Sequence, residues 1–258
     1  MNLFISKIYQ IFDKIHIFVI GCKTKIDRSG KYINNQKSKK DKEMKKYKLE
    51  QFLQDSQADI GTGLLITRGF GFCFTLKQPH RWGKTKAGFS ILPFGGIGGK
   101  VEQNELPATS LYREAIEEVG SDVEIVKYGN QTILMDSDSI QKISLVTDLL
   151  NEPLPIIIFR IPRAEVGRKL FTNVLIYAGK FTSSEIKSID DPALFEMNGE
   201  LLLHLVKKPM SVKEFRQAGG KIISKIELPD NGILKPIGTA IAIARCLKAK
   251  VITSQTFE

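Results

Sequence analysis

Three glutamates, Glu114, Glu117 and Glu118, are spaced so that they could carry metal chemistry. In a helix, residues three and four apart are neighbours, so these carboxylates would crowd one flank. Like charges at this spacing repel by roughly 0.2–0.5 kcal/mol per pair. A divalent cation would remove the conflict, because clustered hard oxygen ligands suit Mg²⁺ or Mn²⁺. The alternative is a glutamate-rich helix face that is merely solvated.

The residues around these glutamates predict the helix that would position them. Pro107 suits the first turn of a helix, and Gly120 suits the position just after its end. Between them runs one apolar stripe at three- and four-residue steps, formed by Ala108, Leu111, Tyr112, Ala115 and Val119. Arg113 lies four residues before Glu117 and two helical turns after Glu105, so it could order these acids by charge-assisted hydrogen bonds.

The complete pattern extends over residues 99–121, GKVEQNELPATSLYREAIEEVGS. It has the spacing G-x5-E-x7-R-E-u-x-E-E-x-G-u, where u is apolar, with Gly99, Glu105, Arg113, Glu114, Glu117, Glu118 and Gly120 at the fixed positions. This stretch resembles the signature of the Nudix hydrolases. Two residues depart from a favourable pattern: Ser121 is polar where an apolar residue is usual, and Leu106 stands at the N-cap, where it offers no side-chain acceptor.

The resemblance implies a fold, a reaction and a set of site residues. The fold would be an α/β/α sandwich with a mixed sheet, and the reaction the hydrolysis of a phosphoanhydride in a nucleoside diphosphate linked to another group. The metal, Mg²⁺ or alternatively Mn²⁺, would be held by Gly99, Glu114, Glu117 and Glu118. Glu105 and Arg113 would support these ligands.

The general base is left open between a signature glutamate and an acid in a later loop. Glu185, a few residues after the predicted strand 172–180, is the candidate from such a loop. Glu196 and Glu200 are the next candidates, and an ordinary surface acid is the alternative for each.

Substrate-binding candidates lie in the loop before the signature, which carries four cations and the single tryptophan. Arg81, Trp82 and Lys84 could hold a diphosphate and stack a base. The alternative is an exposed connection in which Trp82 covers the edge of the core. Arg68 is a further candidate, since residues 64–68 faintly resemble the pattern of coenzyme A-specific members. The proline that many ADP-ribose hydrolases carry after the signature is absent near Met135.

The formal net charge of +10 is concentrated at the N-terminus. Residues 1–48 hold 13 Lys or Arg against 4 Asp or Glu, whereas residues 49–258 hold 25 against 24. We therefore expect a poorly ordered amphipathic and basic extension over 1–48, a hydrolase core over 49–205 and a strand–helix elaboration packed on the core over 206–258. The extension could touch anionic lipid weakly, or be dispensable with Met44 as the effective start. No specific nucleic-acid partner is expected, because the core is nearly neutral.

The cysteines of the chain indicate the cellular setting that we expect. Three scattered cysteines without metal-ligand spacing favour a reducing, cytoplasmic setting. A homodimer is left open.

Two rival functions also remain: a Nudix-fold domain that binds a nucleotide-like ligand without hydrolysing it, and an interaction protein whose basic tail binds RNA or membrane.

Local patterns predict the order of elements. Helices are expected over 49–55, 107–119, 137–150, 211–218 and 239–250. Strands are expected over 63–68, 70–77, 89–93, 123–128, 155–161, 172–180 and 221–228. Strands that alternate with a few helices indicate a mixed α/β fold.

Overall fold

The computed structural model describes residues 25–26, 32–33, 44–69, 71–120, 123–127, 129–163, 169–182 and 191–252. The chain divides into two units, Met1–Glu43 and Met44–Glu258. In the first unit the described residues are two short strands, β1 (Lys25–Ile26) and β2 (Tyr32–Ile33), which pair antiparallel. Among the described residues no helix is long and apolar enough to cross a membrane.

The strands of the second unit belong to one 14-stranded sheet. They are β3 (Lys46–Lys48), β4 (Ala58–Arg68), β5 (Gly71–Leu76), β6 (Gly83–Lys84), β7 (Ser90–Gly95), β8 (Val123–Val126), β9 (Gln131–Met135), β10 (Ile140–Val146), β11 (Ile157–Pro162), β12 (Phe171–Phe181), β13 (Ala193–Met197), β14 (Met210–Ser211), β15 (Lys221–Ser224) and β16 (Ile233–Pro236). The helices are α2 (Leu49–Leu53), η1 (Pro79–Arg81), α3 (Pro107–Val119), α4 (Gly199–Lys207), α5 (Val212–Gln217) and α6 (Thr239–Lys248).

The two longest strands, β4 and β12, join the two halves of the sheet. They run parallel along residues 58–66 and 171–179. On its other side β12 pairs antiparallel with β11 and, near its end, with β8. The end of β4 pairs antiparallel with β5. Parallel and antiparallel neighbours therefore occur in one sheet, which confirms the predicted mixed α/β class.

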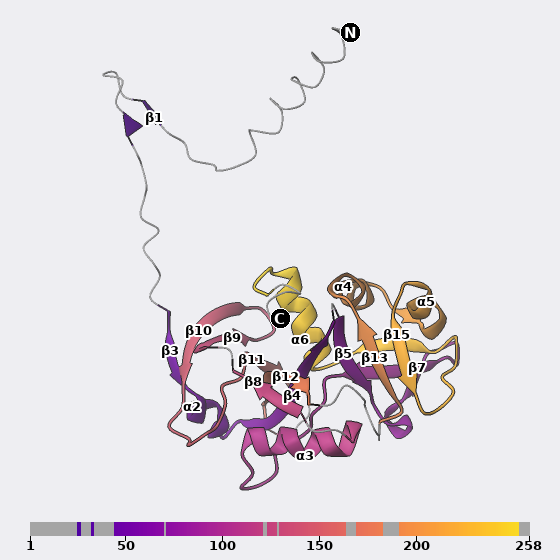
Figure 1. Cartoon of the computed structure of the whole chain (residues 1–258), viewed down its shortest axis with the longest axis horizontal. Coiled ribbons are helices and arrows are strands. Elements are labelled where there is room, and N and C mark those ends of the chain that lie inside the picture. Colours follow the sequence, from indigo (N-terminus) through magenta and orange to yellow (C-terminus); the bar gives the residue numbers. More distant parts are fainter. Residues whose placement is uncertain are drawn as a thin grey trace. The chain divides into compact units, whose positions relative to one another are not determined.

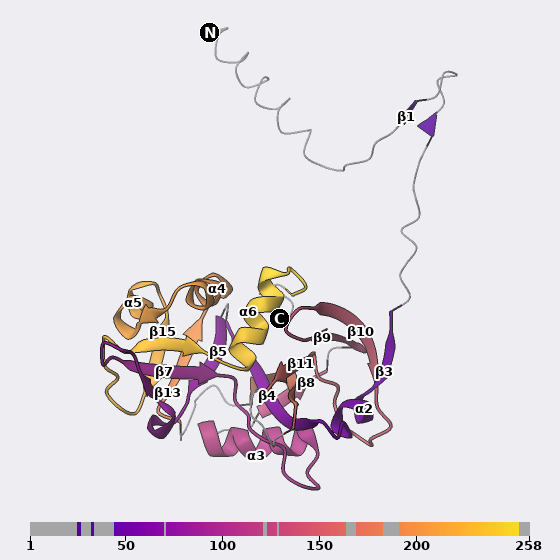
Figure 2. The same cartoon turned by 180° about the vertical axis from the view of Figure 1, so that it is seen from behind.

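Helices cover both faces of the sheet, with α3 on one side and α4, α5 and α6 on the other (Figures 1 and 2). The apolar stripe of α3 is buried in one core cluster together with Leu64 and Tyr177. The second cluster joins α4 and α6 to aromatic side chains of the strands, among them Phe72, Phe94 and Phe195. The predicted α/β/α layering is thus confirmed. Tyr112, expected in the stripe of α3, is instead 43% exposed, so the buried part of the stripe is narrower than predicted.

One predicted element is wrong. Residues 137–150 were expected to be helical, but they contain strand β10, which pairs antiparallel with β9. Within β10, Ile143 and Leu145 are fully buried while Lys142 and Val146 are exposed. That alternation has the two-residue period of a strand. Pairing with β9 therefore selects a strand here over the predicted helix.

Other predicted elements differ mainly in their ends. The strand predicted over 63–68 begins five residues earlier, at Ala58, because the parallel partner β12 supplies hydrogen bonds along that length. The strand predicted over 221–228 ends at Ser224. The helices predicted over 49–55, 211–218 and 239–250 are each shorter in the structure.

The C-terminal elements pack beside the 95–99 glycine loop and strand β7, which leads into it. Strand β16 runs parallel to β7, and β15 pairs with β13. Thr239, the first residue of α6, is 4% exposed and lies against Gly63 and Gly96. A Cβ on Gly96 would be 2.7 Å from the Leu64 carbonyl oxygen and 2.9 Å from Thr239 Cβ. Glycine is therefore required for the loop and α6 to approach this closely.

Candidate active site

Helix α3 is fixed at both ends. Gly120 ends it in the left-handed conformation, with φ of 59°, as the sequence predicts. At the start, Leu106 offers no cap, but the distant carboxylate of Glu152 does: its Oε1 accepts from Ala108 N at 3.0 Å. Tyr177 Oη donates to the same oxygen at 3.3 Å. Glu152 is 8% exposed, and burial raises its pKa above the ordinary value.

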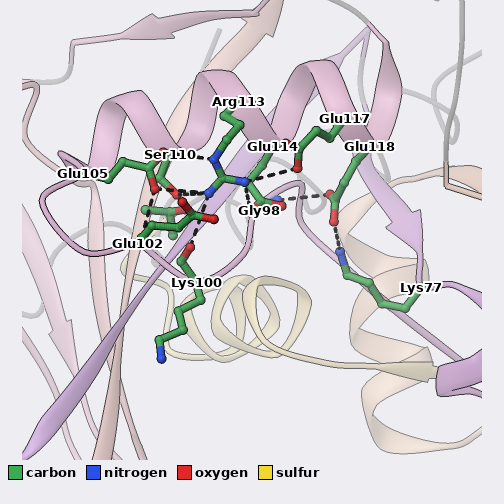
Figure 3. Close-up of polar contacts among 11 residues, drawn as sticks. Lys77, Gly98, Lys100, Glu102, Glu105, Ser110, Arg113, Glu114, Glu117 and Glu118 are labelled. Carbon is green, nitrogen blue, oxygen red and sulfur yellow. Dashed lines mark hydrogen bonds and ion pairs between the residues drawn. The ribbon is translucent and has the colours of Figure 1, made fainter.

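Arg113 bonds three of the signature glutamates at once (Figure 3). Its Nε and Nη2 donate to the two carboxylate oxygens of Glu105 at 3.0 and 3.2 Å. Its Nη1 donates to Glu114 Oε1 at 2.9 Å and to Glu117 Oε2 at 3.2 Å. These bonds, above all the one to Glu105, raise the pKa of Arg113 beyond its usual range. The same bond lowers the pKa of Glu105.

The glycine loop approaches the helix closely. A Cβ on Gly99 would lie 2.4 Å from Glu114 Oε1, so only glycine leaves room for that carboxylate. Gly98 has φ of 136°, and its N–H donates to Glu118 Oε2 at 3.1 Å. The Gly99 carbonyl accepts from Thr62 N at 2.8 Å.

Glu118 has a different environment from the other two helix acids. Its Oε1 lies 2.5 Å from Lys77 Nζ, and its Oε2 lies 3.5 Å from Thr75 Oγ1. The Glu118 side chain is 14% exposed, whereas that of Glu117 is 58% exposed. Burial raises the pKa of Glu118 to about 7, although the Lys77 ammonium opposes the rise.

Asp191 is a site residue that sequence reasoning missed. It precedes β13 and is 4% exposed, and its N–H donates to the Glu118 carbonyl at 2.8 Å. Its Oδ2 has no hydrogen-bond partner among the described residues and lies 3.9 Å from Lys77 Nζ. Burial raises its pKa. Its Asp-Asp-Pro context has no helical or strand periodicity, so only the folded chain brings it beside α3.

Two adjoining cavities meet at the glycine loop. One, of about 320 Å³, is lined by α3, the loop and the 77–81 segment, through residues Lys77, Gln78, His80, Arg81, Gly98, Gly99, Lys100, Glu114, Glu117, Glu118 and Asp191. The other, of about 340 Å³, shares Lys77, Arg81, Gly98, Gly99 and Lys100 with the first. It continues to Arg163 and to Thr239, and Arg163 is itself bonded to Asp59 at 2.7 Å. An elongated, anionic molecule could therefore lie across both cavities.

The donor set of the first cavity suits Mg²⁺ or Mn²⁺ in its chemistry. It offers carboxylate oxygens and a backbone carbonyl, which are the hard ligands that these ions prefer. Among the described residues, however, no three acidic, histidine or cysteine side chains are placed to hold one ion together. Lys77 and Arg113 contact the carboxylates from opposite sides instead.

The predicted substrate residues lie in different places. Arg81 lines both cavities. Trp82 lines neither: its Nε1 donates to the Lys77 carbonyl at 2.7 Å, and its ring packs against the core. Lys84 lies exposed in β6, and Arg68 ends β4; neither residue lines either of these two cavities.

Of the candidates for a base outside the signature, the structure describes Glu196 and Glu200. Glu185 falls outside the described residues. Glu196 lies in β13 and faces Lys221 Nζ at 3.6 Å, and Glu200 lies in the first turn of α4. Neither of these two lines the cavity that the signature acids line.

Comparisons with known proteins give similarity to solved structures alone. No protein-family model and no curated protein matches the chain. A MutT Nudix hydrolase from Burkholderia pseudomallei is 17% identical, with 72% of this chain and 95% of that chain covered and a TM-score of 0.33. A Nudix hydrolase from Clostridium perfringens is 19% identical, with coverage of 56% and 83% and a TM-score of 0.30. An ADP-ribose pyrophosphatase from Streptococcus suis is 12% identical, with coverage of 74% and 91% and a TM-score of 0.29.

The first two of these structures carry the name of the family that the 99–121 motif resembles. At these identities and TM-scores the likeness carries no argument about function, which the motif and the geometry of the site supply.

Proposed function

We propose that this protein is a metal-dependent Nudix hydrolase that cleaves a phosphoanhydride in a nucleoside diphosphate linked to another group. The observation that carries the proposal is one cavity lined by the three helix glutamates, Gly98 and Gly99, and Asp191. The three glutamates alone would suit a solvated helix face. Their carboxylates line one cavity beside a glycine loop, and Arg113 bonds Glu114 and Glu117 from one side. This arrangement favours a site for metal and phosphate.

Within this proposal the chain's own residues take distinct tasks. Gly99, Glu114, Glu117 and Glu118 are the metal-ligand candidates, and Glu105 acts through Arg113 to orient Glu114 and Glu117. A bound Mg²⁺ would polarise a phosphoryl oxygen and acidify water near it. Arg81 and Lys100, which line both cavities, would hold the anionic oxygens on either side of the scissile bond.

The proton acceptor we propose is Asp191. Its Oδ2 is buried at the cavity wall without a hydrogen-bond partner among the described residues. In the reaction, a water oxygen would attack phosphorus, the bridging P–O bond would break, and the water proton would pass to this carboxylate. The leaving phosphate would carry away the bridging oxygen.

The test is hydrolysis by the purified full-length protein of a panel of nucleotide-sugars, dinucleotides and nucleoside triphosphates, with Mg²⁺ and with EDTA. We expect turnover that requires the metal and falls by about 100-fold or more in Glu114→Gln. Glu124→Gln is the matched control, since Glu124 is an exposed acid paired with Lys180 at 3.1 Å. Turnover that survives EDTA or Glu114→Gln would contradict the proposal. Nucleotide binding without turnover would favour a non-catalytic, ligand-sensing domain instead.

A further inference from the structure

Lys77 is a buried cation inside the candidate site. The residue is 8% exposed, and its ammonium lies 2.5 Å from Glu118 Oε1, 3.5 Å from Thr75 Oγ1 and 3.9 Å from Asp191 Oδ2 (Figure 3 shows the contact with Glu118). A lysine this deeply buried requires paired carboxylates, because an isolated ammonium is strongly disfavoured away from water.

The backbone of Lys77 is fixed on both sides. Its N–H donates to the Pro93 carbonyl at 2.9 Å, in the strand that leads into the glycine loop. Its carbonyl accepts from Trp82 Nε1 at 2.7 Å, and the Trp82 ring packs against the core. The backbone from which the lysine side chain extends is therefore fixed by the fold, and its ammonium is held by Glu118 and Thr75. This assigns Trp82 a supporting role for Lys77.

The contacts of Lys77 leave Glu118 less available to a metal ion than Glu114 and Glu117. Both oxygens of Glu118 already face donors: Lys77 at Oε1, and Gly98 N at Oε2. A divalent ion bound about 2.1 Å from Glu118 Oε1 would lie close to the ammonium, and the two cations would repel. Glu114 and Glu117 contact Arg113 through one oxygen each, so each retains a second oxygen for a metal ion.

The balance of charge in the cavity also favours a small number of bound metal ions. Four carboxylates line it, those of Glu114, Glu117, Glu118 and Asp191, together with three cationic side chains, those of Lys77, Arg81 and Lys100. With this balance, fewer divalent ions are needed to neutralise the acids before an anionic substrate binds.

We propose that Lys77 takes the place of one divalent cation between Glu118 and Asp191, so that metal binding is confined to the Glu114–Glu117 end of the cavity. The inference rests on the proposed function and narrows it, because Glu118, one of the metal-ligand candidates, is paired with Lys77 in place of a metal ion. Lys77 is thus a built-in counter-ion that sets how many metal ions the site accepts.

The experiment counts bound metal directly, with Mn²⁺ alone as the probe. Free Mn²⁺ is measured by electron paramagnetic resonance in titrations of the full-length protein, of Lys77→Met and of Lys77→Arg. We expect Lys77→Met to bind roughly one more Mn²⁺ ion per chain than wild type, because Glu118 and Asp191 become free to ligate. Lys77→Arg keeps the charge and should bind the wild-type number.

A double variant and a surface control make the result specific. Lys77→Met with Glu118→Gln should return to the wild-type number, since the added ion needs the Glu118 carboxylate. Lys48→Met removes a lysine from an exposed pair with Asp148, 2.6 Å apart, and should change nothing. Mn²⁺ should raise the Tm of Lys77→Met by more than it raises the Tm of wild type. This measurement checks that the variant is folded and binds the added ion.

The outcomes separate this inference from the proposed function. If wild type binds Mn²⁺ and hydrolyses nucleotides while Lys77→Met binds the same number of ions with the same affinity, the role of Lys77 is overturned and the hydrolase stands. If neither protein binds Mn²⁺, both proposals fall. An extra ion in Lys77→Met that persists after Glu118→Gln would also overturn the inference.

Discussion

Glu114 and Gly99 show how closely single residues are matched in this site. The Glu114 carboxylate occupies the space where a Cβ on residue 99 would stand, 2.4 Å from its Oε1. The same carboxylate is bonded by Arg113 from the other side at 2.9 Å. Its position is therefore fixed by a steric fit and a charge-assisted hydrogen bond together.

Gly99→Ala should displace the Glu114 carboxylate and lower turnover and Mg²⁺ affinity by about tenfold or more, since misplaced groups close to the reaction are costly. Gly83→Ala is the matched control, because a Cβ there meets only Ile91 side-chain atoms at 3.7 Å. Steady-state kinetics at several Mg²⁺ concentrations measure the effect. Equal losses in the two variants would show that the fit around Glu114 is unimportant.

Arg113→Lys tests the hydrogen bonds of the guanidinium apart from its charge. Lysine cannot bond both oxygens of Glu105 and also reach Glu114 and Glu117. We expect metal affinity to fall by about 10- to 100-fold, the usual effect of losing a residue that orients metal ligands. Arg216→Lys, in an exposed pair with Asp230 at 2.9 Å, should leave affinity unchanged. Titration with Mn²⁺ checks both variants.

At the scale of elements, the start of α3 depends on a residue far along the chain. Glu152 accepts from Ala108 N where Leu106 provides no cap. Because α3 carries the three glutamate candidates for metal binding, this contact connects the 149–155 segment to the position of the site.

Glu152→Ala should lower the free energy of unfolding by about 1–3 kcal/mol, because the helix loses its cap and the buried Tyr177 hydroxyl loses its acceptor. Tyr177→Phe keeps the cap and removes one bond at 3.3 Å, so its loss should be smaller. Urea unfolding of both variants measures the difference. A larger loss in Tyr177→Phe would contradict the capping role.

The raised pKa of Glu152 also predicts a pH dependence. The folded protein keeps the Glu152 proton to a higher pH than the unfolded chain does. Its contribution to stability is therefore greatest below the ordinary glutamate pKa and is lost as pH rises through the folded-state pKa. Urea unfolding at several pH values should show a smaller decline over this window in Glu152→Gln than in wild type. Identical pH profiles would contradict this assignment.

At the scale of the whole molecule, the unit Met44–Glu258 contains both core clusters. A fragment that starts at Met44 should keep the wild-type turnover, and its Tm should change by no more than about 2 °C. A fragment that starts at Ala58 should be destabilised, because it loses the fully buried Leu49 and the Glu50 carboxylate that accepts hydrogen bonds from Thr147 and Asp148. Thermal unfolding compares them. A large loss in the Met44 fragment would show that the first unit contributes to folding or activity.

The sequence by itself was sufficient for the signature helix, its ends, and the contacts of Arg113 with Glu105 and Glu117. The helix and the Arg113–Glu117 contact depend on the 3.6-residue period of one helix, and a period is visible in the order of residues. Glu105 lies just before the helix begins, and its contact with Arg113 was expected from its short separation along the chain. The mixed α/β class followed from strand and helix patterns. The region 137–150 was predicted wrongly because a short apolar pattern fits both structures until a partner strand pairs with it.

Only the tertiary structure decided which distant residues meet the signature. Lys77, Asp191 and Glu152 come from separate loops and strand ends, and nothing in their local sequence marks them as neighbours of α3. The sheet brings them together through long-range pairing, such as that of β4 with β12. The grouping of the signature glutamates thus follows from their spacing along one helix. Which charged side chains surround them was decided by how the chain packs.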